Sequence, residues 1–409
     1  MTGAGSEGRA ADRRPGWCHS SPRCPVLPRD HQIREGKHMT SGCEQQELRE
    51  RGIGPRGPRG PQLVVSEGSI RSIEDLRSHL QWAIELEHAT LPSYLCALYS
   101  IDGTGNAAAA DIVHSVFLEE MLHLALAANL LNAVGGAPVL DDPRLLPSYP
   151  RQLPHSRPPI EVPLVPFGRD ALKVYLSIER PCASTAPPQS DGYETIGQFY
   201  EAIRLGILTL VEELGPELLF SGDPARQVSD REFRGGPGRI FKIHDLDTAL
   251  AALRLIVEQG EGVEHLEVWD GDRDMFHPER DAVGHYYRFR QLLSGREFQR
   301  GDTPLTGPTG PEILIDWDAV RPMAANPKLA DHAPDSAVWK AQMGFNIAYC
   351  NLLDLLEQTF NGAPQMLARA IPVMFQLRAL AVELMSTPVP GGSFVAGPTF
   401  EYVEPAARR

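Results

Sequence analysis

The chain has 409 residues, and a composition of 42% hydrophobic and 22% charged residues is ordinary for a soluble globular protein. Lysine and arginine total 39 against 53 aspartates and glutamates, which gives a formal net charge of -14. This balance disfavours nucleic acid and anionic membranes as partners, because binding phosphate groups requires a concentrated basic face.

Membrane insertion and disulfide cross-linking are also disfavoured. No apolar run reaches the roughly 18–20 residues that a membrane-spanning helix needs. The 6 cysteines are scattered without any Cys-x-x-Cys pair, so neither a disulfide framework nor a zinc ribbon is expected. We therefore predict a cytoplasmic protein without a membrane partner.

The N-terminal residues 1–65 are rich in arginine, glycine, proline and serine, as in the run at 54–61. Such a segment buries too little apolar surface to offset the entropy of ordering it, so we predict a disordered tail. Met39 is an alternative to Met1 as the start of the protein. We expect the folded domain, with a C-terminal helical extension, to span residues 70–403.

Apolar residues at helical spacing predict a first long helix from Ser72, which has the features of an N-cap, to about residue 98. Pro92 should kink this helix. A second helix is predicted at 107–134. The proline-rich residues 137–190 are expected to be a long irregular crossover with one or two strands. Residues 294–335 are also expected to be irregular, and both segments could form a lid. Further helices are predicted at about 195–214, 246–268, 282–293, 336–360 and 364–385. The pattern therefore predicts an all-α fold.

The strongest local signal lies in the second predicted helix, where Glu120 and His123 leave the same face. The rest of that face is apolar: Val113, Val116, Phe117, Leu124, Ala127 and Leu131. A carboxylate and an imidazole that point into an apolar core need compensation, which a metal ion supplies. Glu-x-x-His is the arrangement of helical bundles that hold two iron or manganese ions. An isolated pair of this kind also arises by chance on a helix surface, so the metal hypothesis needs partners from other helices.

Glu87, Glu261 and His285 fall on apolar stripes of other predicted helices. Glu87 is alternatively a carboxylate at the edge of its stripe, and His285 a core histidine bonded to a backbone carbonyl. Glu261 is bracketed by Gly260 and Gly262, which indicates crowding, a widened turn or the end of the helix. These residues supply the partners that Glu120 and His123 require.

Glu201 in the third predicted helix lies beside the main apolar stripe and is the weakest candidate from the pattern. With it, the candidate metal ligands are Glu87, Glu120, His123, Glu201, Glu261 and His285. The pattern leaves open three alternatives: Glu212–Glu213 in place of Glu201, Glu258 beside Glu261, and a Glu261–His265 chelate. Other histidines of the predicted helices are expected at the surface: His79, His88 and His114. Four carboxylates and two imidazoles suit two metal ions bridged by carboxylates.

Residues 86–95 resemble the first-helix signature of the ferritin-like domain in iminophenylpyruvate dimer synthases, the enzymes of the violacein and rebeccamycin pathways. The similarity continues in chain order at 119–123, 129–138, 197–201, 258–262, 285–289 and 397–402. It covers roughly residues 70–403. This resemblance implies a ferritin-like four-helix bundle with additional C-terminal helices, and it adds support for Glu201 and His285 as ligands.

The synthases that the sequence resembles are much longer chains, so their oxidative coupling of two amino-acid-derived imines is not carried over. The resemblance implies a metal-dependent oxidoreductase of secondary metabolism that uses two iron ions, or manganese, with dioxygen or peroxide. Glu120 and Glu261 are the expected bridging, catalytic carboxylates, and His123 and His285 would each fix one ion. The expected partner is a small organic substrate, and the chain could form a homo-oligomer. A manganese catalase-like activity and a non-catalytic metal-binding bundle are the alternative functions.

Overall fold

The computed structural model describes residues 69–102, 105–183, 185–233, 238–263 and 267–408. These residues belong to one unit of the chain, Val65–Arg409. The tail predicted at 1–65, and Met39 within it, lie outside the described residues. Within the described part of the chain, helices dominate and the strands form two short two-stranded sheets. The predicted all-α fold is therefore confirmed.

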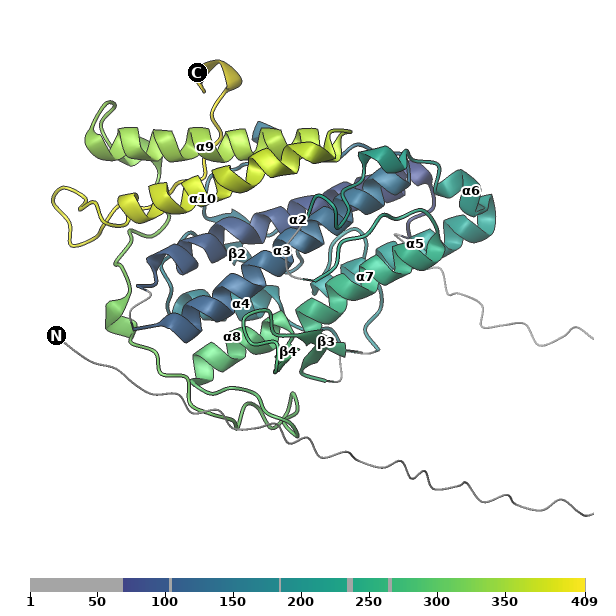
Figure 1. Ribbon diagram of the computed structural model, residues 1–409, viewed down its shortest axis with the longest axis horizontal. Coiled ribbons are helices and arrows are strands. Elements are labelled where there is room, and N and C mark those ends of the chain that lie inside the picture. The colour runs from purple at the N-terminus through teal and green to yellow at the C-terminus, as the bar shows by residue number, and fades with distance from the viewer. Residues whose placement is uncertain (1–68, 103–104, 184, 234–237, 264–266, 409) are drawn as a thin grey trace, which may run out of the picture. The chain divides into compact units, whose positions relative to one another are not determined.

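The central bundle consists of the long helices α2 (Ile73–Ser100), α3 (Ala107–Ala133), α5 (Ile196–Leu214) and α7 (Leu246–Glu261), as Figure 1 shows. Helix α2 packs along α3, and α5 packs along α7. The two pairs meet through contacts of α2 with α5 and of α3 with α7. The interior between these helices is where the inward-facing polar side chains of the candidate site lie.

Helix α3 is the most apolar element of the bundle. It is the helix in the described residues whose length and composition would suit a membrane span, but 83% of its most apolar window is buried inside the protein. Burial of this kind is what a core helix shows. Glu119, Glu120 and His123 lie in the middle of this buried helix, each at most 6% exposed.

Capping residues determine where the bundle helices begin and end. The Ser72 hydroxyl accepts the Asp75 N–H at 3.0 Å, as predicted for the start of α2. Helix α7 begins at a capping box between Asp245 and Thr248. It ends at Glu261 and not at 268 as predicted, because Gly262 has φ +89° and an added Cβ would lie 2.2 Å from the Glu267 carbonyl oxygen.

The crossover at 137–190, predicted to be irregular with one or two strands, also contains a helix that was not predicted. It holds the strand pair β1 (Arg151–Gln152) and β2 (Glu161–Val162), followed by the ten-residue helix α4 (Arg169–Ile178). The residues that α4 buries follow helical spacing: Ala171, Leu172, Tyr175 and Ile178. Proline-rich flanks on both sides hide this short amphipathic pattern in the sequence.

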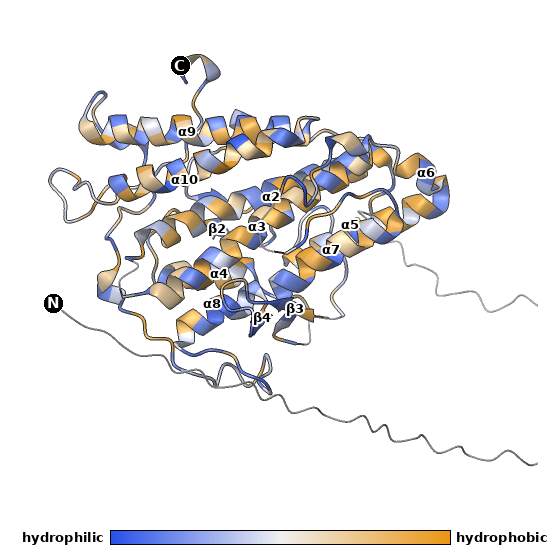
Figure 2. Cartoon of the chain, in the orientation of Figure 1, coloured by the Kyte–Doolittle hydropathy of each residue, from blue (hydrophilic) through white to orange (hydrophobic). Residues whose placement is uncertain are grey.

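A hairpin separates α7 from α8 (His285–Ser294). Strands β3 (Trp269–Arg273) and β4 (Asp281–Val283) pair antiparallel, with a bulge between Trp269 and Arg273. Figure 2 shows this region as mostly hydrophilic, in contrast to the apolar stretches of the bundle helices. Helix α8 packs against α3, α4 and α7, which brings its first residue to the bundle interior. The short helix α6 (Pro216–Leu219) follows α5.

The predicted C-terminal helices are present as α9 (Ala337–Phe360) and α10 (Leu367–Leu384). They pack side by side, and α10 contacts α2 (Figure 1). A buried hydrogen bond of 2.6 Å joins His88 Nε2 of α2 to the Tyr349 hydroxyl of α9. His88 is 4% exposed and His79 is 2% exposed, so the expectation that both lie at the surface was wrong. Each lies on the side of α2 that other elements cover.

Candidate metal centre

Carboxylates and imidazoles from four elements meet inside the bundle, and we call them the acid–imidazole cluster. Glu87 comes from α2, Glu120 and His123 from α3, Glu179 from the C-cap of α4, and His285 from the start of α8. All are at most 5% exposed. His285 Nδ1 lies 2.8 Å from Glu120 Oε1 and 3.6 Å from Glu179 Oε2. His123 Nδ1 lies 3.8 Å from both Glu87 Oε2 and Glu120 Oε1.

Burial and crowding of like charges shape the electrostatics of the cluster. Burial and the neighbouring Glu120 raise the pKa of Glu87 well above its usual range, and the same causes raise the pKa of Glu179. Burial, with the charge of His285, lowers the pKa of His123 to about 3. The cluster therefore holds acids that are costly to ionise together without a cation, and a metal ion would offset that cost.

The arrangement of donor atoms fits a metal ion. Ligand atoms of Glu120, His123 and His285 lie within 4.8 Å of one another. His285 is fully buried, and its Nδ1 faces carboxylate oxygens of Glu120 and Glu179 at 2.8 and 3.6 Å. Carboxylate oxygens and imidazole nitrogens together suit iron and manganese. Burial lowers the pKa of His285, but the neighbouring carboxylates of Glu119, Glu120 and Glu179 together outweigh burial and raise it. A metal ion at Nδ1 would replace the charge of the proton.

Hydroxyl groups hold one oxygen of each cluster carboxylate and leave the other facing the imidazoles. Tyr200 donates to Glu87 Oε1, and Tyr94 donates to Glu179 Oε1. Thr90 Oγ1 donates to Glu120 Oε2 at 3.1 Å. The remaining oxygens, Glu87 Oε2, Glu120 Oε1 and Glu179 Oε2, are the ones that lie near Nδ1 of His123 or His285. The carboxylates are thereby oriented before any metal binds.

The outward nitrogens of both imidazoles are hydrogen-bonded. His123 Nε2 lies 2.8 Å from Gln259 Oε1, and His285 Nε2 lies 3.0 Å from Glu119 Oε2. Burial alone would raise the pKa of Glu119, but the buried guanidinium of Arg288 and the neighbouring His285 hold it at about 2. Partners of this type fix the tautomer and the ring orientation of metal-binding histidines.

Two predicted ligands, Glu201 and Glu261, are not brought to the cluster. Glu201 follows the inward-facing Tyr200 by one residue, so it turns away and pairs with Arg204 at 2.6 Å with its side chain 39% exposed. Glu261 is buried, but its two oxygens accept the N–H groups of Gly197 (2.8 Å) and Cys182 (2.9 Å). Its carboxylate therefore joins the end of α7 to the start of α5.

Glu179 takes the place in the cluster that the sequence analysis gave to Glu201. Glu179 directly follows the buried Ile178 at the end of α4. The sequence indicates an inward-facing carboxylate here only if residues 169–178 are first recognised as a helix. Glu119 was missed as a second buried acid beside the Glu-x-x-His pair. Of the alternatives, Glu212 and Glu213 are exposed, Glu258 is partly buried in α7, and His265 lies outside the described residues.

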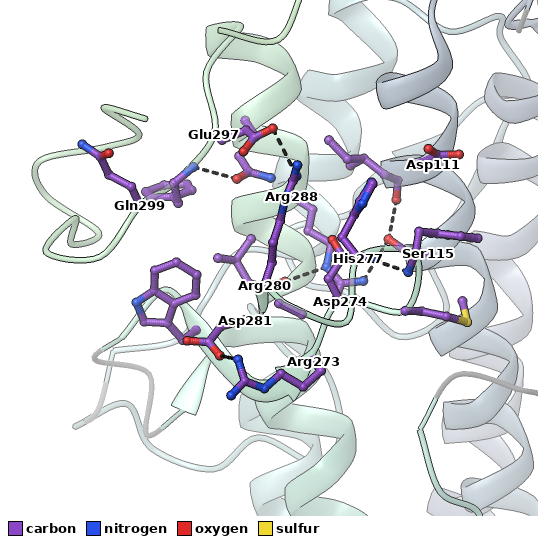
Figure 3. Close-up of a pocket in the computed structure, with 18 of the residues that line it drawn as sticks. Asp111, Ser115, Arg273, Asp274, His277, Arg280, Asp281, Arg288, Glu297 and Gln299 are labelled. Carbon is purple, nitrogen blue, oxygen red and sulfur yellow. Dashed lines mark hydrogen bonds and ion pairs between the residues drawn. The ribbon is translucent and has the colours of Figure 1, made fainter. Parts of the chain in front are cut away.

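A pocket of about 500 Å³ lies against the outer side of Arg288, as Figure 3 shows. Ser115 and Arg288 form part of its lining and are joined by a hydrogen bond of 3.0 Å. Arg288 also donates a hydrogen bond of 2.9 Å to Glu119, the hydrogen-bond partner of His285. Arg288 therefore separates the pocket from Glu119. Aromatic and charged side chains share the rest of the lining: Trp269, Phe276, Phe298, Arg273, Arg280 and Asp281.

The comparison with protein families decides the identity of the fold. A family model described as ferritin-like matches residues 80–294, from within α2 to the end of α8. The chain belongs to the ferritin-like family. The match contains every residue of the acid–imidazole cluster of this ferritin-like protein, whereas α9 and α10 lie beyond it. The predicted ferritin-like fold is confirmed.

Two curated relatives of this ferritin-like protein are enzymes of secondary metabolism, which confirms the predicted resemblance. The chain is 27% identical over 267 residues to the 2-imino-3-(indol-3-yl)propanoate dimerase of Chromobacterium violaceum. It is 25% identical over 412 residues to the dichlorochromopyrrolate synthase of Lentzea aerocolonigenes. The alignments cover 58% and 85% of this chain but 24% and 38% of those relatives, so it spans well under half of their length.

A solved structure shares the fold. The crystal structure of a ferritin-like protein from Caulobacter vibrioides superimposes with a TM-score of 0.54 at 23% identity. The superposition covers 82% of this chain and 100% of the other. At this identity the likeness supports the fold and carries no statement about activity.

Proposed function

We propose that this ferritin-like protein is a metal-dependent oxidoreductase of secondary metabolism in which the acid–imidazole cluster holds two iron ions, with manganese as the alternative metal. The proposed ligands are Glu87, Glu120, His123, Glu179 and His285. The observation that carries the proposal is the buried convergence of these side chains, with Nδ1 of both imidazoles and one oxygen of each carboxylate turned to a common centre. Glu179 replaces Glu201 and Glu261 in this ligand set.

Bound iron would supply redox chemistry with dioxygen or peroxide as the oxidant. The protein itself would orient the ligand carboxylates and exclude water from the site. Tyr94, Tyr200 and Thr90 hold the carboxylates at one oxygen each, which reduces the reorganisation required on binding. Glu120 lies between the two imidazoles, 2.8 Å from His285 Nδ1 and 3.8 Å from His123 Nδ1, so its carboxylate would help to hold both ions. Burial of the cluster excludes bulk water from the site.

The substrate that we propose is a small organic molecule of the amino-acid-derived class. One relative is named as a dimerase of an imino-indolyl-propanoate and the other as a dichlorochromopyrrolate synthase, which supports this class for the present chain. The pocket of Figure 3 is the proposed binding place, because Trp269, Phe276 and Phe298 offer aromatic contacts and its inner wall contacts Glu119 through Arg288. A cytoplasmic location and a homo-oligomeric state stay predictions.

Metal analysis of the purified protein after anaerobic reconstitution with Fe(II) tests this proposal. We expect about two ions per chain, and a Glu120→Gln, His123→Gln double variant should retain almost none, because removing charged ligands abolishes affinity. Glu179→Gln should lower the metal content as well. Fewer than one ion per chain in the wild-type protein would contradict the proposal.

Glu201→Gln is the matched control for Glu179→Gln, since both remove one carboxylate charge. Glu201 pairs with Arg204 at the surface of α5, so its loss should leave the metal content unchanged. The reverse result, with metal lost in Glu201→Gln and kept in Glu179→Gln, would restore the ligand set predicted from the sequence.

A further inference from the structure

Gln259 connects the outer nitrogen of His123, Nε2, to the β3–β4 hairpin by two hydrogen bonds. His123 Nε2 lies 2.8 Å from Gln259 Oε1, and Gln259 Nε2 donates to Asp272 Oδ2 at 2.9 Å. A carboxylate only accepts hydrogen bonds, so Asp272 turns the amide group of Gln259 towards itself and leaves the carbonyl for His123. That carbonyl in turn requires a proton on Nε2, and the lone pair of Nδ1 then faces the cluster.

A second set of hydrogen-bonded residues connects the outer nitrogen of His285, Nε2, to the same hairpin. His285 Nε2 donates to Glu119 Oε2 at 3.0 Å, and Glu119 Oε1 accepts from Arg288 at 2.9 Å. The other arm of the Arg288 guanidinium donates to Asp270 Oδ2 at 2.8 Å. Glu119, Arg288 and Asp270 are each at most 6% exposed, so this is a buried and fully paired chain of charges.

Asp270 and Asp272 lie two residues apart on β3 and therefore on the same face of the strand. Gly271 between them has φ +85°, a conformation that residues with a Cβ rarely adopt. The strand is bulged here, and the Asp272 N–H donates to Asp270 Oδ1 at 2.8 Å. A single short strand, placed between α7 and α8, therefore contacts the supports of both imidazoles.

We propose that β3 is the common outer support of the two imidazole ligands, with Asp272 and Asp270 as positioning residues. Asp272 acts through Gln259 on His123, and Asp270 acts through Arg288 and Glu119 on His285. Each keeps a proton on Nε2 and directs Nδ1 to the centre of the cluster. The role in metal binding rests on the proposed function, whereas the orientation of the imidazoles is a property of the protein without metal.

The first test uses ¹⁵N NMR of histidine-labelled, metal-free protein. In the wild type we expect His123 to show a single tautomer with the proton on Nε2. Asp272→Asn should convert this to a mixture of tautomers, because asparagine also donates and allows the Gln259 amide to turn over. Asp281→Asn is the control, since Asp281 pairs with Arg273 and Arg300 on the outer side of the same hairpin. An unchanged His123 tautomer in Asp272→Asn would overturn the proposal.

The second test is a titration of metal-free protein with cobalt(II), followed by its visible absorption. Asp272→Asn and Asp270→Asn should each weaken binding about tenfold or more relative to Asp281→Asn, as expected for residues that orient metal-binding histidines. Circular dichroism establishes that each variant is folded. Wild-type affinity in both variants would overturn the role of β3 in metal binding. A wild-type protein that binds no cobalt(II) would contradict the proposed function, and the NMR result would still decide the orientation of His123.

Discussion

Individual side chains prepare the acid–imidazole cluster before any metal is bound. Tyr200 and Tyr94 each donate to one oxygen of a carboxylate, and both hydroxyl groups are buried. Burial, together with the neighbouring carboxylates, raises the pKa of both tyrosines well above their usual range, so they remain protonated donors. The free oxygens of Glu87 and Glu179 are consequently held towards the imidazoles.

Replacing Tyr200 or Tyr94 with phenylalanine tests this orienting role. Each variant should bind Fe(II) or cobalt(II) about tenfold more weakly, because a hydrogen bond to a charged group contributes ~1.5–3 kcal/mol and ~1.4 kcal/mol is tenfold in affinity. Tyr193→Phe is the control, since the equally buried Tyr193 donates to the Pro154 carbonyl outside the cluster. Affinities equal to that of the control in a metal titration would show that the two hydroxyls have no orienting role.

Among the elements, the end of α7 and the start of α5 are joined by one carboxylate. Glu261 accepts the Gly197 N–H in the first turn of α5, where backbone N–H groups lack helical partners and favour a negative charge. The approach is close, since an added Cβ on Gly197 would lie 2.4 Å from Glu261 Oε1. The close approach therefore requires glycine at position 197. Glu261 has a structural role, because its carboxylate joins the two helices.

Gly197→Ala should destabilise the protein by about 1–3 kcal/mol, the usual cost of inserting a methyl group into a packed site. Gly344→Ala in α9 is a control of opposite sign, because nothing lies within 4 Å of a Cβ added there. In a helix interior that change should stabilise by about 0.5–1 kcal/mol. Urea denaturation of both variants measures the difference, and equal free energies of unfolding would contradict the close contact with Glu261.

For the whole molecule, metal binding and folding are expected to be coupled. The cluster takes ligands from α2, α3, the end of α4 and the start of α8, which only the folded chain brings together. Helices α9 and α10 lie beyond the family match and add a buried contact to α2 through His88 and Tyr349. A ligand that binds the native state alone stabilises all of these elements together.

Calorimetric unfolding with and without Fe(II) measures this coupling. At a free metal concentration about 100 times the Kd, the native state should gain ~2.7 kcal/mol, which appears as a higher Tm. The Glu120→Gln, His123→Gln variant should show no shift, whereas Glu201→Gln should behave as the wild type. A metal-induced shift of equal size in the double variant would place the binding site elsewhere.

The features of the fold that depend on neighbouring residues were accessible from the sequence. Helical periodicity predicted α2, α3, α5, α9 and α10, and the Ser72 cap predicted where α2 begins. The same periodicity placed Glu87, Glu120 and His123 on inward faces, where they are found buried. Helix α4 was not predicted, because ten residues between proline-rich segments show only weak helical periodicity.

The composition of the cluster was decided by tertiary structure. Glu179, Glu201 and Glu261 are all acids near apolar positions, and nothing local distinguishes them. Packing of α4 against α8 brings Glu179 to His285, the turn of α5 directs Glu201 to Arg204, and the close approach of Gly197 engages Glu261. Periodicity indicates which face a side chain occupies, but its partner depends on contacts between residues far apart in the chain. The sequence by itself therefore determined a ferritin-like bundle with a Glu120–His123 pair, and only the packing of its elements decided which side chains surround that pair.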